Sequence, residues 1–264
     1  MIQLVQVAFK FILLTFLLDL IPINETDLFS SGAISVREST VDLQIRVDHK
    51  IFVFEKANGN LEKVKVGMHL LPFAQVPKIE GLESSFKNFT WKRTKDGSIQ
   101  IRSFYSPESA ILIWTIFQDG RLKFEAVGEN LKNQDFLGLG FDFQEDGIKL
   151  VHWENSIQEP GEYSFESVSD KGNVLEVQSF SVLNLDFKEV KVGVKTETPQ
   201  SHFRISADQS DPDINSTINL NFLFYSLPNQ SLSEEPRTPN SMSDVGSLQG
   251  NLVRDPIVLW FDFH

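Results

Sequence analysis

The chain of 264 residues contains no cysteine, three methionines and three tyrosines. Without cysteine it can form neither a disulfide nor a thiolate metal site, and it has no thiol nucleophile. It also lacks the glycine-rich phosphate loops and the G-x-S-x-G elbow that mark nucleotide-binding proteins and serine hydrolases. These absences exclude several large classes of enzyme.

Positive charge is also scarce, because 36 acidic residues outnumber 24 basic ones and leave a formal net charge of −12. Proteins that bind nucleic acid or anionic membranes use clustered Lys and Arg to displace counterions. We therefore predict no nucleic-acid partner.

The metal-binding patterns are missing as well. The five histidines are dispersed, without H-x-H or H-E-x-x-H spacing. Asp208, Asp211 and Asp213 do not follow the spacing of a calcium loop, and no Glu closes that segment. We expect no metal and no cofactor.

Residues 1–30 form an apolar segment whose longest uninterrupted run is Phe11–Leu18. This run is too short for a transmembrane helix, which needs about 20 residues. The segment resembles a signal peptide in its position, but Lys10 lies inside the apolar segment, Asp19 directly follows the run, and no small-x-small cleavage site is present. A signal and a remnant of a longer reading frame both fit. We expect a secreted or periplasmic protein, with a cytoplasmic location as the alternative.

Hydrophobic residues make up 41% of the chain, including 23 Phe, which is ample for a large core. From about residue 31 onward they recur with a period of two. Val41, Leu43, Ile45 and Val47 alternate with polar residues, as in a half-buried strand. Further strands are expected at 50–54, 64–71, 89–93, 98–105, 111–117, 122–126, 137–143, 148–153, 162–168, 174–185, 189–198, 203–207, 218–225 and 257–263. Loops are expected at 71–87 and 226–250, which are rich in proline or polar residues.

The stretch 110–143 is the most informative part of the sequence. Two strands flank Asp119-Gly120, which is a strong hairpin signal, and a third strand follows at 137–143. The spacing predicts an antiparallel meander of three strands. The whole pattern predicts an all-β fold, a large antiparallel β-sandwich over residues 31–264.

The same stretch carries a family resemblance. W-x-I-x-x-D-G-x-L-x-F from Trp114 to Phe124, LGLGFDF at 137–143 and Trp153 together resemble the C-terminal domain of family 2-type β-galactosidases and related bacterial glycoside hydrolases. That domain is a supersandwich of the galactose-mutarotase-like class. The family's Trp loop reads roughly W-x-G-x-G-P, followed by an aromatic and a basic residue. Here 153–163 keeps Trp153, Pro160-Gly161 and Tyr163 but lacks the earlier glycines and the basic residue.

The resemblance implies a carbohydrate-associated domain without catalytic residues of its own. In the family, the catalytic residues lie on a TIM barrel, for which this chain is too short. The implied partner is carbohydrate or the catalytic domain of a glycoside hydrolase. The alternatives are a stand-alone, mutarotase-like sugar epimerase and an exported structural or adhesion β-sandwich.

Sugars stack on exposed aromatic rings that are rimmed by polar groups. Trp153 and Tyr163, at the two ends of a polar loop, are the predicted platforms, whereas Trp114 and Trp260 lie in apolar runs and are expected in the core. An epimerase would need a His acid and a carboxylate base in one pocket. The predicted carbohydrate-binding residues are Trp153, Tyr163, His152, Glu154 and Glu162.

Overall fold

The computed structural model describes residues 33–71, 73–76, 78–107, 110–128, 136–144, 148–155, 159–165, 175–198, 201–208, 217–225 and 256–264. All of them belong to one compact unit, Gly32–His264. The expectations for 1–30, for 226–250 and for the Asp-rich turn beyond Asp208 lie outside the described residues.

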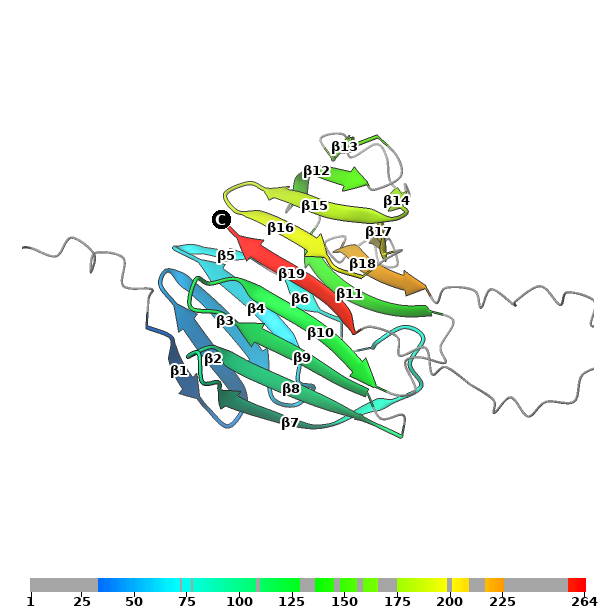
Figure 1. Ribbon diagram of the computed structural model, residues 1–264. Coiled ribbons are helices and arrows are strands. Elements are labelled where there is room, and N and C mark those ends of the chain that lie inside the picture. The colour runs from blue at the N-terminus through cyan, green and yellow to red at the C-terminus, as the bar shows by residue number, and fades with distance from the viewer. Residues whose placement is uncertain are drawn as a thin grey trace, which may run out of the picture. The chain divides into compact units, whose positions relative to one another are not determined.

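The described residues form strands and no helix, and the strands make three antiparallel sheets (Figure 1). The all-β, antiparallel β-sandwich expected from the alternating pattern is therefore confirmed. Since the described residues contain no helix, none of them forms a helical membrane span. The first sheet consists, in spatial order, of β1 (Ser35–Glu38), β2 (Asp42–Val47), β3 (Lys50–Glu55), β4 (Leu61–Val66) and β5 (His69–Leu71).

The second sheet has nine strands, and Figure 1 shows them in order from β7 at the bottom to β13 at the top. They are β7 (Ser85–Arg93), β8 (Ile99–Ser106), β9 (Ala110–Ile116), β10 (Leu122–Gly128), β19 (Ile257–Phe263), β16 (Lys191–Thr196), β15 (Phe180–Phe187), β12 (Ile148–Asn155) and β13 (Gly161–Ser164). The third sheet is β14 (Leu175–Val177), β17 (Ser201–Asp208), β18 (Thr217–Tyr225), β11 (Phe136–Gln144) and β6 (Ala74–Gln75).

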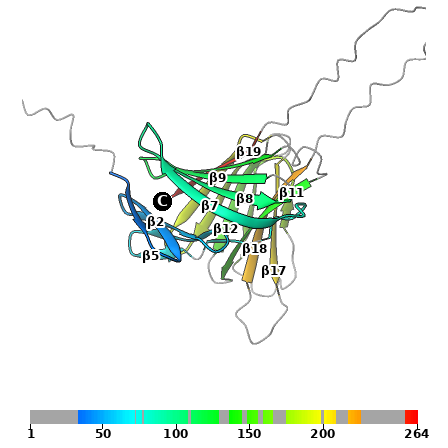
Figure 2. The same ribbon diagram turned by 90° about the horizontal axis from the view of Figure 1, so that it is seen from below.

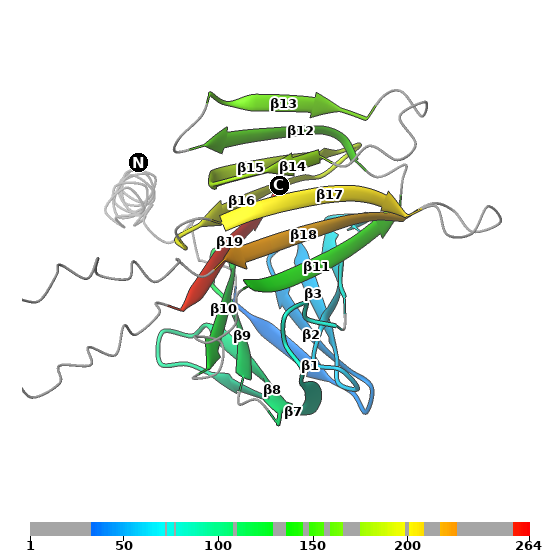
Figure 3. The ribbon, with the colours of Figure 1, turned by 90° about the vertical axis from the view of Figure 1, so that its right-hand side faces the viewer.

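Both five-stranded sheets pack on the same face of the nine-stranded sheet, which we call its inner face (Figures 2 and 3). The first sheet reaches it through Phe52, whose ring meets Phe263 edge-on at 5.8 Å. The third sheet reaches it through Phe203, which meets Phe180 at 5.4 Å. Aromatic pairs of this geometry contribute about 0.5–1.5 kcal/mol beyond the area that they bury.

β19 lies in the middle of the nine-stranded sheet, hydrogen-bonded to β10 on one side and to β16 on the other. Its inward residues Leu259, Phe261 and Phe263 are fully buried. Phe261 contacts Phe73, which stacks on Phe141 of the third sheet at 4.4 Å. The three sheets thus share one continuous apolar core.

Several local expectations were wrong, among them the single strand expected at 174–185, which is divided into β14 and β15 by a turn at Ser179, whose φ is 58°. The expected meander stops after β9 and β10, because the free edge of β10 is taken by β19 and β11 pairs with β18 and β6 instead. The single strand expected at 64–71 is broken by Gly67, whose φ of 60° makes the β4–β5 turn. Val41 is exposed rather than inward, because it lies in the turn between β1 and β2.

Candidate functional site

The five predicted site residues lie on β12 and β13, but they divide between the two faces of the nine-stranded sheet. The register pairs Trp153 with Gly161 and Val151 with Tyr163, whereas His152 pairs with Glu162. Successive side chains of a strand point to opposite faces. Because Val151 is fully buried, Trp153 and Tyr163 lie on the inner side, and His152, Glu154 and Glu162 lie on the opposite, outer face.

Trp153 is packed between layers. Its ring meets Phe203 of β17 edge-on at 5.9 Å and belongs to the rim of the core. On β13 the ring occupies the space where a side chain at Gly161 would stand. Gly161 therefore has a packing role here. Tyr163 meets Phe165 edge-on at 4.9 Å. Sugar binding by these two rings stays a prediction.

The outer face is polar across the β13 half of the sheet. One row runs through Glu162, His152, Asn184, Gly193 and Asp262, each directly opposite the next on the neighbouring strand. At about 4.8 Å per strand, the row spans roughly 19 Å. Within this row Glu162 and Asn184 are exposed, and His152 and Asp262 are half-buried.

The adjacent row carries the aromatic residue of this face. It runs through Glu154, Val182, Lys195, Trp260 and Lys123. Trp260 is half-buried, so the expectation that it belongs to the core was wrong, whereas Trp114 is fully buried as expected. The physical reason is parity: in the apolar run of β19, Leu259 and Phe261 point inward, and the residue between them must point outward.

Four neighbours fix the indole of Trp260. Its Nε1 donates a hydrogen bond to Glu197 Oε1 at 2.7 Å. Phe117 stacks on it with ring centroids 5.3 Å apart and an angle of 24° between the ring planes. The Arg121 guanidinium carbon and Lys123 Nζ lie 5.4 and 5.3 Å from the ring centroid, within the range of cation–π attraction.

The cations beside Trp260 are themselves paired with carboxylates. Arg121 Nε lies 2.7 Å from Asp119 Oδ2, and Lys123 Nζ lies 3.0 Å from Glu125 Oε1. Burial raises the pKa of Asp119, but the backbone N–H and guanidinium of Arg121 outweigh it, so the pKa is lowered from its usual value. Asp119 is therefore ionised at neutral pH and holds Arg121 in place.

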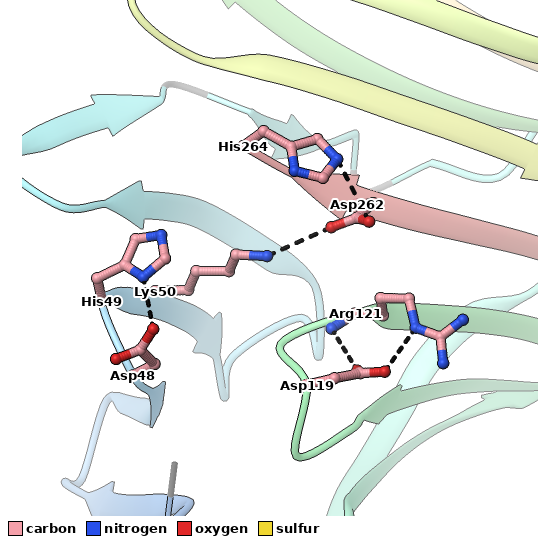
Figure 4. Close-up of polar contacts among 7 residues, drawn as sticks. All are labelled: Asp48, His49, Lys50, Asp119, Arg121, Asp262 and His264. Atoms are coloured by element: carbon pink, nitrogen blue, oxygen red, sulfur yellow. Dashed lines mark hydrogen bonds and ion pairs between the residues drawn. The ribbon is translucent and has the colours of Figure 1, made fainter. Parts of the chain in front are cut away.

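Asp262 lies at the end of the polar row and contacts two basic side chains (Figure 4). Lys50 Nζ reaches it from β3 of the first sheet, at 3.3 Å from Oδ1, and His264 Nε2 lies 3.3 Å from Oδ2. The Lys50 side chain is only 9% exposed, whereas that of Asp262 is 37% exposed. The pair links two sheets and leaves part of the carboxylate open to solvent.

The Trp260 surface combines a half-buried indole with paired charges. The exposed part of such a ring can contact the apolar face of a ligand, and the charged groups beside it can hydrogen-bond the ligand's polar groups. Among the described residues, no group of three or more His, Asp or Glu side chains is placed to hold a metal ion. The alternation of side chains along β19 could have predicted that Trp260 faces solvent. The charged Asp262 lies two residues later, on the same face of the strand.

Comparisons with known proteins identify no family. No family model matches the sequence, and no curated protein matches it. Among solved structures, the chain is similar to a "putative mutarotase" from Salmonella typhimurium, with 9% identity and a TM-score of 0.44, over 88% of this chain and 93% of that one. At this identity and score the likeness carries no inference about function.

Proposed function

We propose that the chain is a non-catalytic, carbohydrate-binding β-sandwich domain of the glycoside hydrolase type, and that it binds sugar on the outer face around Trp260. One observation carries the proposal: Trp260 is a half-buried indole on a polar sheet face, with paired charges beside it. The other tryptophans offer less, since Trp114 is fully buried and Trp153 and Trp91 pack against the core.

The physical basis is the two-sided character of a sugar ring. Its C–H face loses contact with water when it stacks on an indole, and its hydroxyls need hydrogen-bond partners at the rim. Arg121 and Lys123, which contact the ring, supply donors. Glu197, which accepts a hydrogen bond from the indole, and Glu125, which pairs with Lys123, supply acceptors. These groups are already held by their own pairs, so little side-chain entropy remains to be lost on binding.

The proposal assigns no catalytic residue. A glycosidase places two carboxylates on either side of the scissile bond. On this face, Glu154 and Glu162 project from neighbouring strands of a single sheet, and Asp262 is paired with Lys50. Carboxylates that share one surface do not enclose a glycosidic bond.

The test is a glycan-binding screen of the full chain, followed by titration of any hit with Trp260→Ala. Trp91→Ala is the matched control, because Trp91 is also half-buried and also donates its Nε1 to a glutamate, Glu38, at 3.0 Å. We expect Trp260→Ala to weaken binding about tenfold or more, equivalent to about 1.4 kcal/mol, and Trp91→Ala to leave it unchanged. If no glycan binds, or if both variants bind like the wild type, the proposal fails, and an exported structural or adhesion sandwich becomes the better description.

A second candidate, mutarotase-like epimerisation of a sugar, is favoured by the direct cross-strand pairing of His152 with Glu162. Side chains paired in this way have Cβ atoms about 5 Å apart, close enough for an acid and a base to act on one sugar. The test is the rate of anomer exchange of free sugars, followed by NMR. Wild-type acceleration that is lost in Glu162→Gln and kept in Glu154→Gln would favour this candidate, and a rate equal to that of buffer would exclude it.

Two further parts of the proposal concern partner and location. The domain is proposed to pack against a glycoside hydrolase catalytic domain, and the chain is proposed to be secreted or periplasmic. Co-purification from the source cells, with mass spectrometry of the bound proteins, tests the first. Cell fractionation tests the second, and recovery only with cytoplasmic markers would contradict it.

A further inference from the structure

We infer that the ligand of the Trp260 face is a neutral oligosaccharide and not an acidic or sulfated one. This inference rests on the proposed function and names its substrate class. It concerns the charged residues next to Trp260, which we call the Trp260 rim: Arg121, Lys123, Lys195, Asp119, Glu125 and Glu197.

The rim carries no net charge. Its three cations, Arg121, Lys123 and Lys195, are balanced by three carboxylates, and 3 − 3 leaves zero. Asp119 and Glu125 hold Arg121 and Lys123 at 2.7 and 3.0 Å. An acidic sugar would have to displace these carboxylates, and the displaced groups would then repel it. The net charge of −12 over the whole chain opposes an anion further.

A neutral sugar meets no such cost. Each hydroxyl is both a donor and an acceptor, so it can donate to a carboxylate and accept from the neighbouring cation while the ion pair stays formed. Hydrogen bonds to charged groups are stronger than those between neutral groups. Paired charges beside an aromatic ring therefore favour a ligand that is rich in hydroxyls and carries no charge.

The length of the site favours a chain of sugars over a single ring. Lys195, Trp260 and Lys123 are directly opposite one another on β16, β19 and β10. Two steps between strands cover about 10 Å, which exceeds the width of one pyranose. We therefore expect the oligosaccharide to lie across the strands, with one unit on Trp260.

The test compares neutral oligosaccharides with uronate and sulfated oligosaccharides of equal length, by titration calorimetry at low and at physiological ionic strength. We expect the neutral ligand to bind about tenfold or more tightly, with an affinity that salt does not change. Trp260→Ala should remove this binding, and the Trp91→Ala control should keep it.

A reversal variant makes the test sharper. Asp119→Asn combined with Glu125→Gln removes the carboxylates from Arg121 and Lys123 and should give the chain a salt-sensitive affinity for uronates. Uronate binding by the wild type that equals or exceeds neutral binding and weakens with salt would overturn the inference and leave the proposed function standing. If neither class binds, the proposed function falls and the inference falls with it.

Discussion

The indole of Trp153 on β12 lies over Gly161 on β13, in the position that a side chain at Gly161 would occupy. Gly161 has no left-handed backbone angle, so its need for glycine comes from this contact alone. The relationship accounts for the glycine at this position of β13.

We expect Gly161→Ala to destabilise the fold by about 1–3 kcal/mol, because the added methyl must push the Trp153 ring out of its contact with Phe203. Gly193→Ala is the matched control. It also lies within a strand of the same sheet, and its nearest neighbour would be Asn184 Oδ1 at 3.5 Å, an ordinary contact. Urea denaturation measures both variants. Equal midpoints would show that the Trp153 ring can move at no cost.

Tyr105 should make the stability of the fold depend on pH in the alkaline range. Its side chain is buried, its hydroxyl has no hydrogen-bond partner among the described residues, and burial raises its pKa to about 12. The folded state therefore keeps the proton longer than the unfolded state does. The stabilisation that comes from the protonated hydroxyl is fully present below about pH 10. Roughly 2–3 kcal/mol of the free energy of unfolding is lost as the pH rises from 10 to 12.

Tyr105→Phe should remove this alkaline loss and should stabilise the protein at neutral pH by about 1 kcal/mol, since no unsatisfied hydroxyl stays buried. Melting temperatures measured from about pH 8 to about pH 12, roughly two units on each side of the usual tyrosine pKa, check both points. A variant less stable than the wild type at neutral pH would show that the hydroxyl has a stabilising partner.

Removing Asp262 from its ion pair with Lys50 should cost more stability than removing Lys50. Asp262→Ala leaves the buried Lys50 ammonium without its carboxylate, and we expect a loss of about 1–3 kcal/mol. Lys50→Met keeps the apolar stem and leaves only a partly solvated carboxylate, so it should cost less. A double-mutant cycle measured by chemical denaturation gives the coupling energy. Additive effects would mean that the two groups do not interact across the sheets.

Asp96 should make the stability of the fold depend on pH in the acidic range. Hydrogen bonds from the hydroxyls of Thr94 and Ser98 lower the pKa of this carboxyl in the β7–β8 turn. Because the folded pKa is lowered, the stabilisation is present above the unfolded pKa and is lost as the pH falls through the folded value. In Thr94→Ala we expect the pKa of Asp96, followed by NMR, to rise toward its usual value. An unchanged pKa would assign the shift to Ser98.

Local pairing was predictable from the sequence, and distant pairing was not. The hairpins of β2 with β3, β7 with β8 and β9 with β10 follow from alternation and short turns. The placement of β11 and β19 depends on partners far along the chain, for which alternation carries no information. That is why the expected meander failed.

The same limit applies to the site. The sequence could name Trp153 and Glu162 as neighbours of one loop, but only the register shows that they face opposite sides of the sheet. Trp260 was misplaced because an apolar run predicts burial on both faces, whereas β19 is covered on its inner face and carries polar neighbours on the other.

The central position of β19 also bears on how the molecule assembles. Phe261 pairs with Leu122 and with Val194, so the strand inserts between segments made long before it during synthesis. Until it arrives, β10 and β16 each present an unsatisfied edge, and such edges recruit other polypeptides. Long-range closure of this kind is slow. The nascent chain is therefore most prone to aggregation in the interval before β19 leaves the ribosome.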